Sequence, residues 1–110
     1  MFKRQADLAH RQLVDGVQLG TMVHGEKTLM AQFKLAKGCD LPEHAHPHEQ
    51  TGILISGRIV ITIDGTDYPA QPGDSWCIGA DVSHSARALE DSVAVEVFSP
   101  VREDYLDDRS

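Results

Sequence analysis

Between residues 17 and 98 the chain is a series of short apolar runs separated by glycine and proline turns, and this pattern restricts its fold most. Asp64-Gly65 is the strongest hairpin signal, because this pair accepts the positive φ values of a type I′ turn. Residues 28–37 alternate apolar and polar side chains, which is typical of a half-buried strand. Helix-like apolar spacing is confined to residues 7–14 at most. The pattern predicts an all-β fold, an antiparallel sandwich or barrel.

A chain of 110 residues has the usual size of one domain and can bury a hydrophobic core. We expect residues 1–16 to cover an edge of the fold, residues 17–100 to form a barrel, and residues 101–110 to be a polar tail. Leu41-Pro42 indicates a loop, since proline does not fit the interior of a sheet. Strands are expected at residues 17–22, 28–37, 51–55, 58–63, 66–70, 75–78, 84–89 and 93–98.

The composition excludes some classes of partner. The net charge is −7 with no basic patch, which argues against nucleic acid, although a pocket with a local field of its own can still accept a small anion. No apolar run approaches the roughly 18 residues of a membrane span, and no secretory signal is visible at the N-terminus. Cys39 and Cys77 do not form a CxxC pair, so we expect reduced thiols and a cytoplasmic location.

Histidines are concentrated in one stretch, residues 38–57, which also carries Gln50. His44 and His46 are two residues apart, so their side chains point to the same side of an extended backbone. Gln50 can add an amide oxygen, and His84 can close the set from another strand. A lone histidine is usually an ordinary surface residue, but this clustering favours a site for one divalent transition metal such as Zn, Ni, Mn or Fe. These neutral ligands leave the ion its full charge, which favours Lewis-acid chemistry.

Other residues near this set are less well determined by the pattern. His48 shares parity with the ligand candidates, but Pro47 interrupts the register, so His48 is assigned to the pocket wall and Glu49 to the surface. In the last strand Glu96 and Phe98 share one face, which could line a pocket or face solvent. Trp76 is expected in the core or an interface rather than as a platform for substrate.

Two segments resemble the motifs of the cupin family. The spacing Gly38-x5-His44-x-His46-x3-Gln50-x6-Gly57 is similar to the first cupin motif, and the segment from Pro72-Gly73-Asp74 to His84 is similar to the second. The resemblance implies a double-stranded β-helix, or jelly-roll barrel, of six to ten antiparallel strands with one metal inside, often in a homodimer. It also implies that the metal ligands are His44, His46, Gln50 and His84.

This sequence departs from the usual cupin pattern at three positions. Cupins usually have Glu where this chain has Gln50, a change that removes anionic charge at the metal and should weaken or retune binding, although a subgroup of small cupins carries the same HxHPHEQ run. Gly79 and Ser83 stand where the second motif often has proline. These two changes loosen the loop before His84 and leave the ligand itself in place.

The C-terminal segment is similar to the end of the pectin-degradation cupins, which convert 4,5-unsaturated uronates to the linear keto form. Carried over, their pocket residues are Glu96, Phe98 and Arg102, with Glu96 in place of a usual Asp. The resemblance implies an enzyme with a small-molecule substrate whose carboxylate pairs with Arg102; the alternative for Arg102 is a solvated pair with Glu103 or Asp104. A metal-dependent dioxygenase and a non-catalytic binding module are the other functions that the pattern allows.

Overall fold

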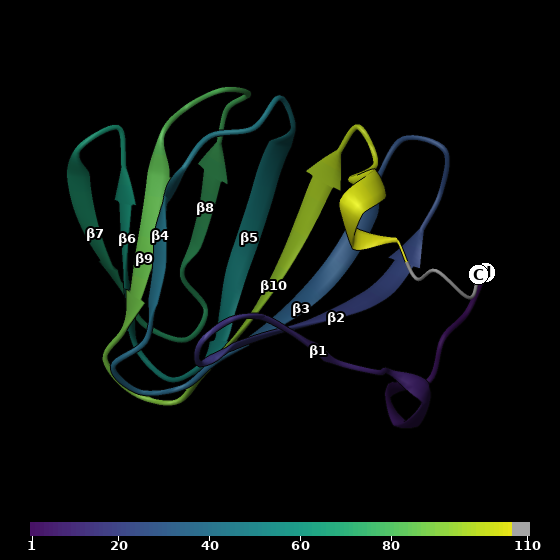
Figure 1. Cartoon of the computed structure of the whole chain (residues 1–110), viewed down its shortest axis with the longest axis horizontal. Helices are drawn as coiled ribbons and strands as arrows, with labels where there is room; N and C mark the ends of the chain where they lie inside the picture. Colours follow the sequence, from purple (N-terminus) through teal and green to yellow (C-terminus); the bar gives the residue numbers. More distant parts are fainter. Residues whose placement is uncertain (107–110) are drawn as a thin grey trace.

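The computed structural model describes residues 1–106, and this part of the chain contains ten strands and two single-turn 3-10 helices (Figure 1). One sheet has the order β1-β2-β3-β10-β5-β8 and the other has the order β4-β9-β6-β7, with antiparallel pairing in both. The strands are β1 (Arg11–Val14), β2 (Val17–His24), β3 (Leu29–Leu35), β4 (Asp40–His44), β5 (Glu49–Ser56), β6 (Ile59–Ile63), β7 (Thr66–Ala70), β8 (Ser75–Ile78), β9 (His84–Ala88) and β10 (Ser92–Ser99), and the 3-10 helices are η1 (Gln5–Asp7) and η2 (Glu103–Tyr105).

The all-β prediction is confirmed, and each expected strand overlaps a strand of the structure. The hairpin between β6 and β7 turns at Asp64 and Gly65, whose φ values of 48° and 80° are those that a type I′ turn requires. Among the described residues, no helix has the length and apolar character needed to cross a membrane.

The structure contains two strands that the sequence pattern did not predict, β1 and β4. The expected loop at Leu41-Pro42 is wrong, because both residues belong to β4. β4 lies at the edge of its sheet, where a proline costs no hydrogen bond on the open side, and its register with β9 is irregular between Leu41 and His44. β1, in the weakly patterned N-terminal segment, is the edge strand of the other sheet.

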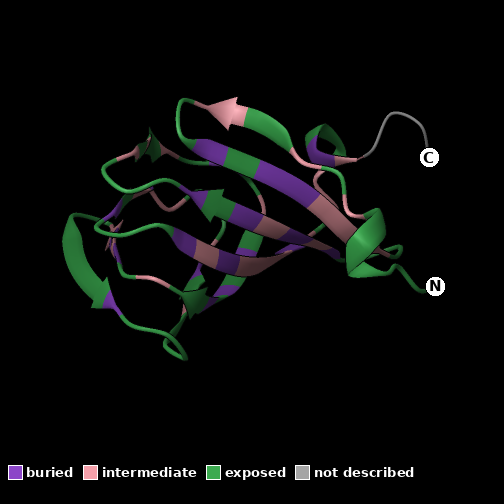
Figure 2. Ribbon diagram, turned by 90° about the horizontal axis from the view of Figure 1, so that it is seen from below, coloured by how far each residue is buried: buried purple, intermediate pink, exposed green. Residues whose placement is uncertain are grey.

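The hydrophobic core lies between the two sheets, and burial alternates along the strands that enclose it (Figure 2). In β3 the side chains of Leu29, Ala31, Phe33 and Leu35 are buried, as the alternation predicted. Each such large apolar side chain contributes about 1.5–3 kcal/mol through burial. The same alternation in β10 directs Ala94, Glu96 and Phe98 to the inner side, and so sets a carboxylate among core residues.

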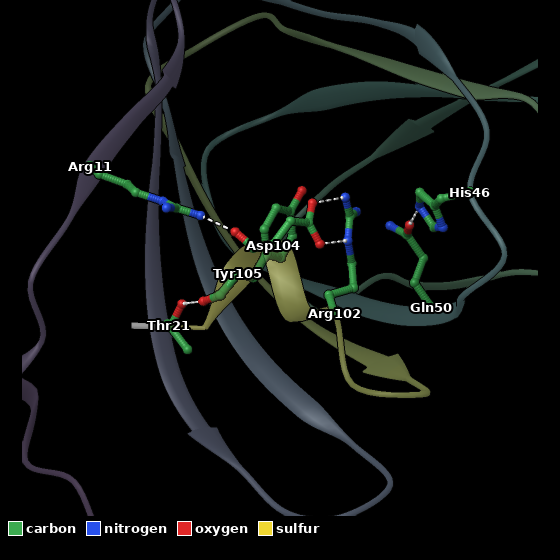
Figure 3. A network of polar contacts seen from close by, with 7 residues as sticks. All are labelled: Arg11, Thr21, His46, Gln50, Arg102, Asp104 and Tyr105. Atoms are coloured by element: carbon green, nitrogen blue, oxygen red, sulfur yellow. Dashed lines mark hydrogen bonds and ion pairs between the residues drawn. The ribbon is translucent and has the colours of Figure 1, made fainter. Parts of the chain in front are cut away.

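The chain folds back after β10 and covers one end of the barrel with residues 101–106, which we call the C-terminal strap. Tyr105 in the strap is only 6% exposed and packs edge-on against the ring of Phe98, with 5.4 Å between centroids. The Thr21 hydroxyl donates to the carbonyl oxygen of Tyr105, and the Arg11 guanidinium donates to the carbonyl oxygen of Asp104 (Figure 3). The expected polar tail therefore begins with a segment that belongs to the core, and its residues 107–110 lie outside the described part.

Candidate metal centre and adjoining pocket

Three of the four expected metal ligands lie together at one end of the barrel. His44 ends β4 and His84 begins β9, and these two residues are paired in register. His46 follows in the loop to β5, and one ring nitrogen of each histidine lies within 4.8 Å of the others. His44 and His84 are 40 positions apart in the chain, and the pairing of β4 with β9 brings them together as expected.

Backbone carbonyls orient two of the three imidazoles. The Nδ1–H of His44 donates to the Pro42 carbonyl over 2.7 Å, and the Nδ1–H of His84 donates to the Val82 carbonyl over 2.8 Å. Because each Nδ1 carries the proton, each Nε2 has a free lone pair, which is the arrangement found at histidines that bind metals. His84 Nε2 is buried and has no hydrogen-bond partner among the described residues, so a bound cation would satisfy an otherwise costly group.

Gln50 is buried beside this cluster, at the start of β5. Its Oε1 accepts a hydrogen bond from His46 Nε2 over 2.7 Å, while its Nε2 donates to Glu96 Oε1 over 3.0 Å. Two ligand atoms on one ion, each about 2.1 Å from it, lie about 3 Å apart, so the pair His46 Nε2 and Gln50 Oε1 has the spacing of metal ligands. His46 Nδ1 is unpartnered and can hold the ring proton when Nε2 binds an ion.

The surroundings of His46 and His84 favour the neutral imidazole, which is the form that binds metals. Burial lowers the pKa of His46, and the positive charge of Arg102 lowers it further. Burial also lowers the pKa of His84, and this effect exceeds the opposing effect of its bond to Val82. The donor set, the tautomers of His44 and His84, and the lowered pKa values of His46 and His84 therefore fit a divalent transition metal.

Glu96 lies on the inner side of β10, which resolves the choice between pocket and solvent that the alternation left open. Its register neighbour on β5 is Gly52, which in turn pairs with Trp76 on β8. Glu96 Oε1 accepts hydrogen bonds from Trp76 Nε1–H over 2.8 Å and from the Gln50 amide. Burial raises the pKa of the Glu96 carboxyl, although these two hydrogen bonds and the Arg102 charge act in the opposite direction.

Trp76 was expected as a core or interface residue, and its bond to Glu96 was not foreseen. The ring lies against Gly52, where an added Cβ would come within 2.5 Å of the indole. The isolated glycine in the apolar strand of residues 51–55 was the signal that could have indicated such a close approach. Behind the ligand cluster, Trp76 and Glu96 border a cavity of about 40 Å³ with largely apolar walls, which is large enough to hold water.

Arg102 and Phe98 lie on the other side of the ligand cluster. Phe98 is 1% exposed, and its ring centroid is 6.0 Å from that of His46. The Arg102 guanidinium binds the Asp104 carboxylate through Nε and Nη2 over 3.2 and 2.6 Å, so the Asp104 partner considered in the sequence is present. However, the Arg102 side chain is only 12% exposed, because it is stacked 3.9 Å from the ring centroid of Tyr105.

The remaining candidates of the histidine stretch take different positions. Glu49 is exposed, as expected. His48 is half-buried, with its ring centroid 5.5 Å from that of His46, and it is not in the group of three converging histidines. Cys39 and Cys77 are both free thiols.

Comparisons with known proteins identify relatives across nearly the whole chain. The family model described as "Cupin domain" matches residues 31–100. Pectin degradation protein KdgF of Dickeya dadantii is 28% identical over 97 residues, which cover 86% of this chain and 88% of that protein. The structure of KdgF from Halomonas sp. superposes with a TM-score of 0.92 at 27% identity, covering 96% of this chain and 98% of that one.

A further relative is larger than this chain. H2HPP isomerase of Bacillus subtilis is 30% identical over 94 residues, which cover 84% of this chain and 40% of that protein. This chain therefore spans about two fifths of the isomerase, so that similarity concerns one part of a longer protein.

Proposed function

Because this chain belongs to the cupin domain family, we propose that it is a metal-dependent enzyme that moves a proton on a small carboxylated, sugar-derived substrate. The observation that carries the proposal is the convergence of three imidazoles, the Gln50 oxygen, the Glu96 carboxylate and the Arg102 guanidinium at one end of the barrel. The similarity to the two KdgF proteins along most of their length supports a 4,5-unsaturated uronate as the substrate. The named activity of the Bacillus subtilis relative supports isomerisation as the reaction class.

The metal would be held by His44, His46, His84 and the amide oxygen of Gln50. A divalent ion bound by these neutral groups supplies Lewis acidity for a substrate oxygen. The Nδ1 bonds of His44 and His84 to backbone carbonyls hold their rings in the orientation that this requires.

The proposed reaction is an isomerisation, in which no atom is gained or lost. As the ring opens, the anomeric hydroxyl loses its proton, the bond from C1 to the ring oxygen breaks, and the ring oxygen takes up a proton to give an enol at C5. The enol then gives up that proton, and a proton is added to C4, which forms the keto group. One group that accepts and returns a proton is sufficient for both steps, and Glu96 is the carboxylate beside the cluster.

The surroundings of Glu96 suit this task. Its Oε1 is engaged by both Trp76 and Gln50, which leaves Oε2 for proton transfer. The raised pKa of this carboxyl brings its proton affinity closer to that of a group that must both accept and release a proton near neutral pH. Arg102 supplies a guanidinium for the substrate carboxylate. Phe98 forms the pocket wall between Arg102 and His46.

A dioxygenase is less well supported by this site. Iron enzymes that activate oxygen commonly use a carboxylate ligand, whereas the fourth ligand candidate here is the neutral Gln50. A non-catalytic binding protein would need no half-buried carboxylate beside the ligands, and Glu96 is such a group. Homodimerisation and a cytoplasmic location remain predictions from the sequence.

The direct test follows 4,5-unsaturated galacturonate by NMR in the presence of the metal-loaded chain. We expect the linear keto form to appear faster than in buffer, and the acceleration to be lost in Glu96→Gln. A rate equal to the uncatalysed rate would remove this substrate from consideration. Consumption of oxygen by the iron-loaded chain would instead support a dioxygenase.

A further inference from the structure

In the part of the chain that the structure describes, the Arg102 guanidinium is hydrogen-bonded along one edge. Among residues 1–106 its hydrogen bonds run from Nε and Nη2 to the two carboxylate oxygens of Asp104. A guanidinium carries five N–H donors in a planar fork, so the edge that includes Nη1 is still available. Figure 3 shows Arg102 with Asp104 on one side and the pair of His46 and Gln50 on the other.

The Arg102 guanidinium lies beside the ligand cluster, next to the aromatic ring of Phe98. The central carbon of the guanidinium is 5.1 Å from the ring centroid of Phe98, and that centroid is 6.0 Å from the ring centroid of His46. The plane of the guanidinium is fixed by the ring of Tyr105 at 3.9 Å and that of Phe98 at 5.1 Å. Arg102 is therefore held between the Asp104 carboxylate and the proposed metal centre.

The Asp104 side chain is not required to hold the C-terminal strap in place. The strap is fastened through backbone carbonyls, since Thr21 donates to that of Tyr105 and Arg11 to that of Asp104. The Tyr105 ring adds a buried contact that does not involve Asp104. Among residues 1–106 the carboxylate of Asp104 thus has one side-chain partner, Arg102, and its removal should leave the fold intact.

We propose that Asp104 is a positioning residue, which binds one edge of the Arg102 guanidinium and turns the other edge toward the carboxylate of a ligand held at the histidine cluster. The proposal rests on the proposed function, because it assumes an acidic ligand at this site. It makes Asp104 a determinant of the preference for a uronic acid over the corresponding neutral sugar. Two hydrogen bonds join Arg102 to Asp104, and such a bidentate pair fixes the direction of the guanidinium, which a single hydrogen bond does not.

The opposite effect of Asp104, competition with the ligand carboxylate, is disfavoured by the geometry. Asp104 occupies the Nε edge, whereas a ligand at the cluster would meet the Nη1 edge, so the two carboxylates do not need the same donors. The Asp104 side chain is 58% exposed and that of Arg102 is 12% exposed. Water therefore screens the repulsion from Asp104 more strongly than the attraction from Arg102.

The test measures binding by calorimetry to the full metal-loaded chain, with sodium D-galacturonate and D-galactose as the two probes. Wild type should bind galacturonate more tightly than galactose. In Asp104→Asn and Asp104→Ala the affinity for galacturonate should fall about tenfold, the order of one charge-assisted hydrogen bond, with galactose affinity unchanged. Glu103→Gln is the matched control, because it removes the adjacent exposed acid of the same helical turn and should leave both affinities at wild-type values.

A second readout separates positioning from a general loss of structure. The Nε–H resonance of Arg102, observed by ¹⁵N NMR, should shift in Asp104→Asn while the thermal midpoint stays near that of wild type. Equal or tighter binding of galacturonate by Asp104→Asn would overturn the proposal, as would a wild type without preference for the acid. Turnover of the unsaturated uronate is measured separately. If the chain prefers the acid in a way that depends on Asp104 but does not turn over the uronate, the proposed reaction is wrong and the positioning by Asp104 is supported.

Discussion

The side-chain amide of Gln50 donates to Glu96 over 3.0 Å, and this contact determines which end of the amide faces the histidines. An ionised carboxylate only accepts hydrogen bonds, so the Gln50 nitrogen must face Glu96 and the oxygen must face His46. The neutral oxygen of Gln50 thus faces the histidine cluster, and the negative charge of Glu96 lies on the other side of the Gln50 amide. Gln50 links the proposed metal centre to the proposed proton-transfer group.

Gln50→Glu should therefore separate metal binding from turnover. The new carboxylate is a stronger ligand for a divalent ion, so metal should be retained, but it loses the N–H donor to Glu96 and sets two carboxylates side by side. We expect turnover to fall by about 10- to 100-fold, since one oriented hydrogen bond to the reacting group is lost. Metal content and turnover measured on the same preparation check this, and full turnover with bound metal would show that the amide is not needed.

Glu96→Gln should lower turnover by about 10²- to 10⁴-fold, the usual range for removal of a general acid–base group. The substituted amide keeps the size of the side chain, so metal content should not change. Single-turnover rates and metal analysis are the measurements. Glu90→Gln, which changes an exposed acid in the turn before β10, is the control and should keep the wild-type rate.

Trp76→Phe removes the indole donor to Glu96 and keeps an aromatic ring over Gly52. We expect a lower kcat with a nearly unchanged KM, because the lost hydrogen bond acts on the proposed proton-transfer group Glu96. Tyr68→Phe, on the exposed strand β7, should leave both constants unchanged. A change confined to KM would show instead that Trp76 contributes to ligand binding.

Gly52→Ala should destabilise the fold, because its Cβ would lie 2.5 Å from the Trp76 ring and force that ring to move. Overpacking of this kind costs about 1–3 kcal/mol in the free energy of unfolding, measured by urea denaturation. Gly25→Ala is the matched control, since no atom lies within 4 Å of the added Cβ. Equal stability of the two variants would mean that Trp76 moves aside without cost.

Local patterns in the sequence were sufficient to predict eight of the ten strands that the structure describes, and to single out histidines that lie close together in the fold. Alternation predicted the buried side of β3, and the spacing of His44, His46 and Gln50 predicted residues that do lie together. Pro42 concealed β4, because the penalty for proline in a sheet disappears at an edge, which is a property of the assembled sheet.

Contacts between distant segments could not be predicted in this way. The bond from Trp76 to Glu96 depends on the register of β8, β5 and β10, and no local pattern records that register. The C-terminal strap was expected to be a polar tail. Its burial depends on contacts such as the hydrogen bond between Thr21 and Tyr105, which are 84 positions apart, and no local pattern indicates such a contact. The pair of Arg102 with Asp104 was one of the alternatives that the sequence offered, but the stacking of Arg102 on Tyr105 was not.

The proposed function depends most directly on whether the histidine cluster binds a metal. Elemental analysis of the untagged chain, purified without chelator, measures this. We predict about one divalent transition-metal ion per chain in wild type, and almost none in His46→Ala and His84→Ala, which each remove one converging imidazole. His24→Ala, which changes a histidine outside the cluster, should retain the wild-type content. A metal-free wild type, or a His84→Ala variant that keeps the full metal content, would contradict the proposed metal centre.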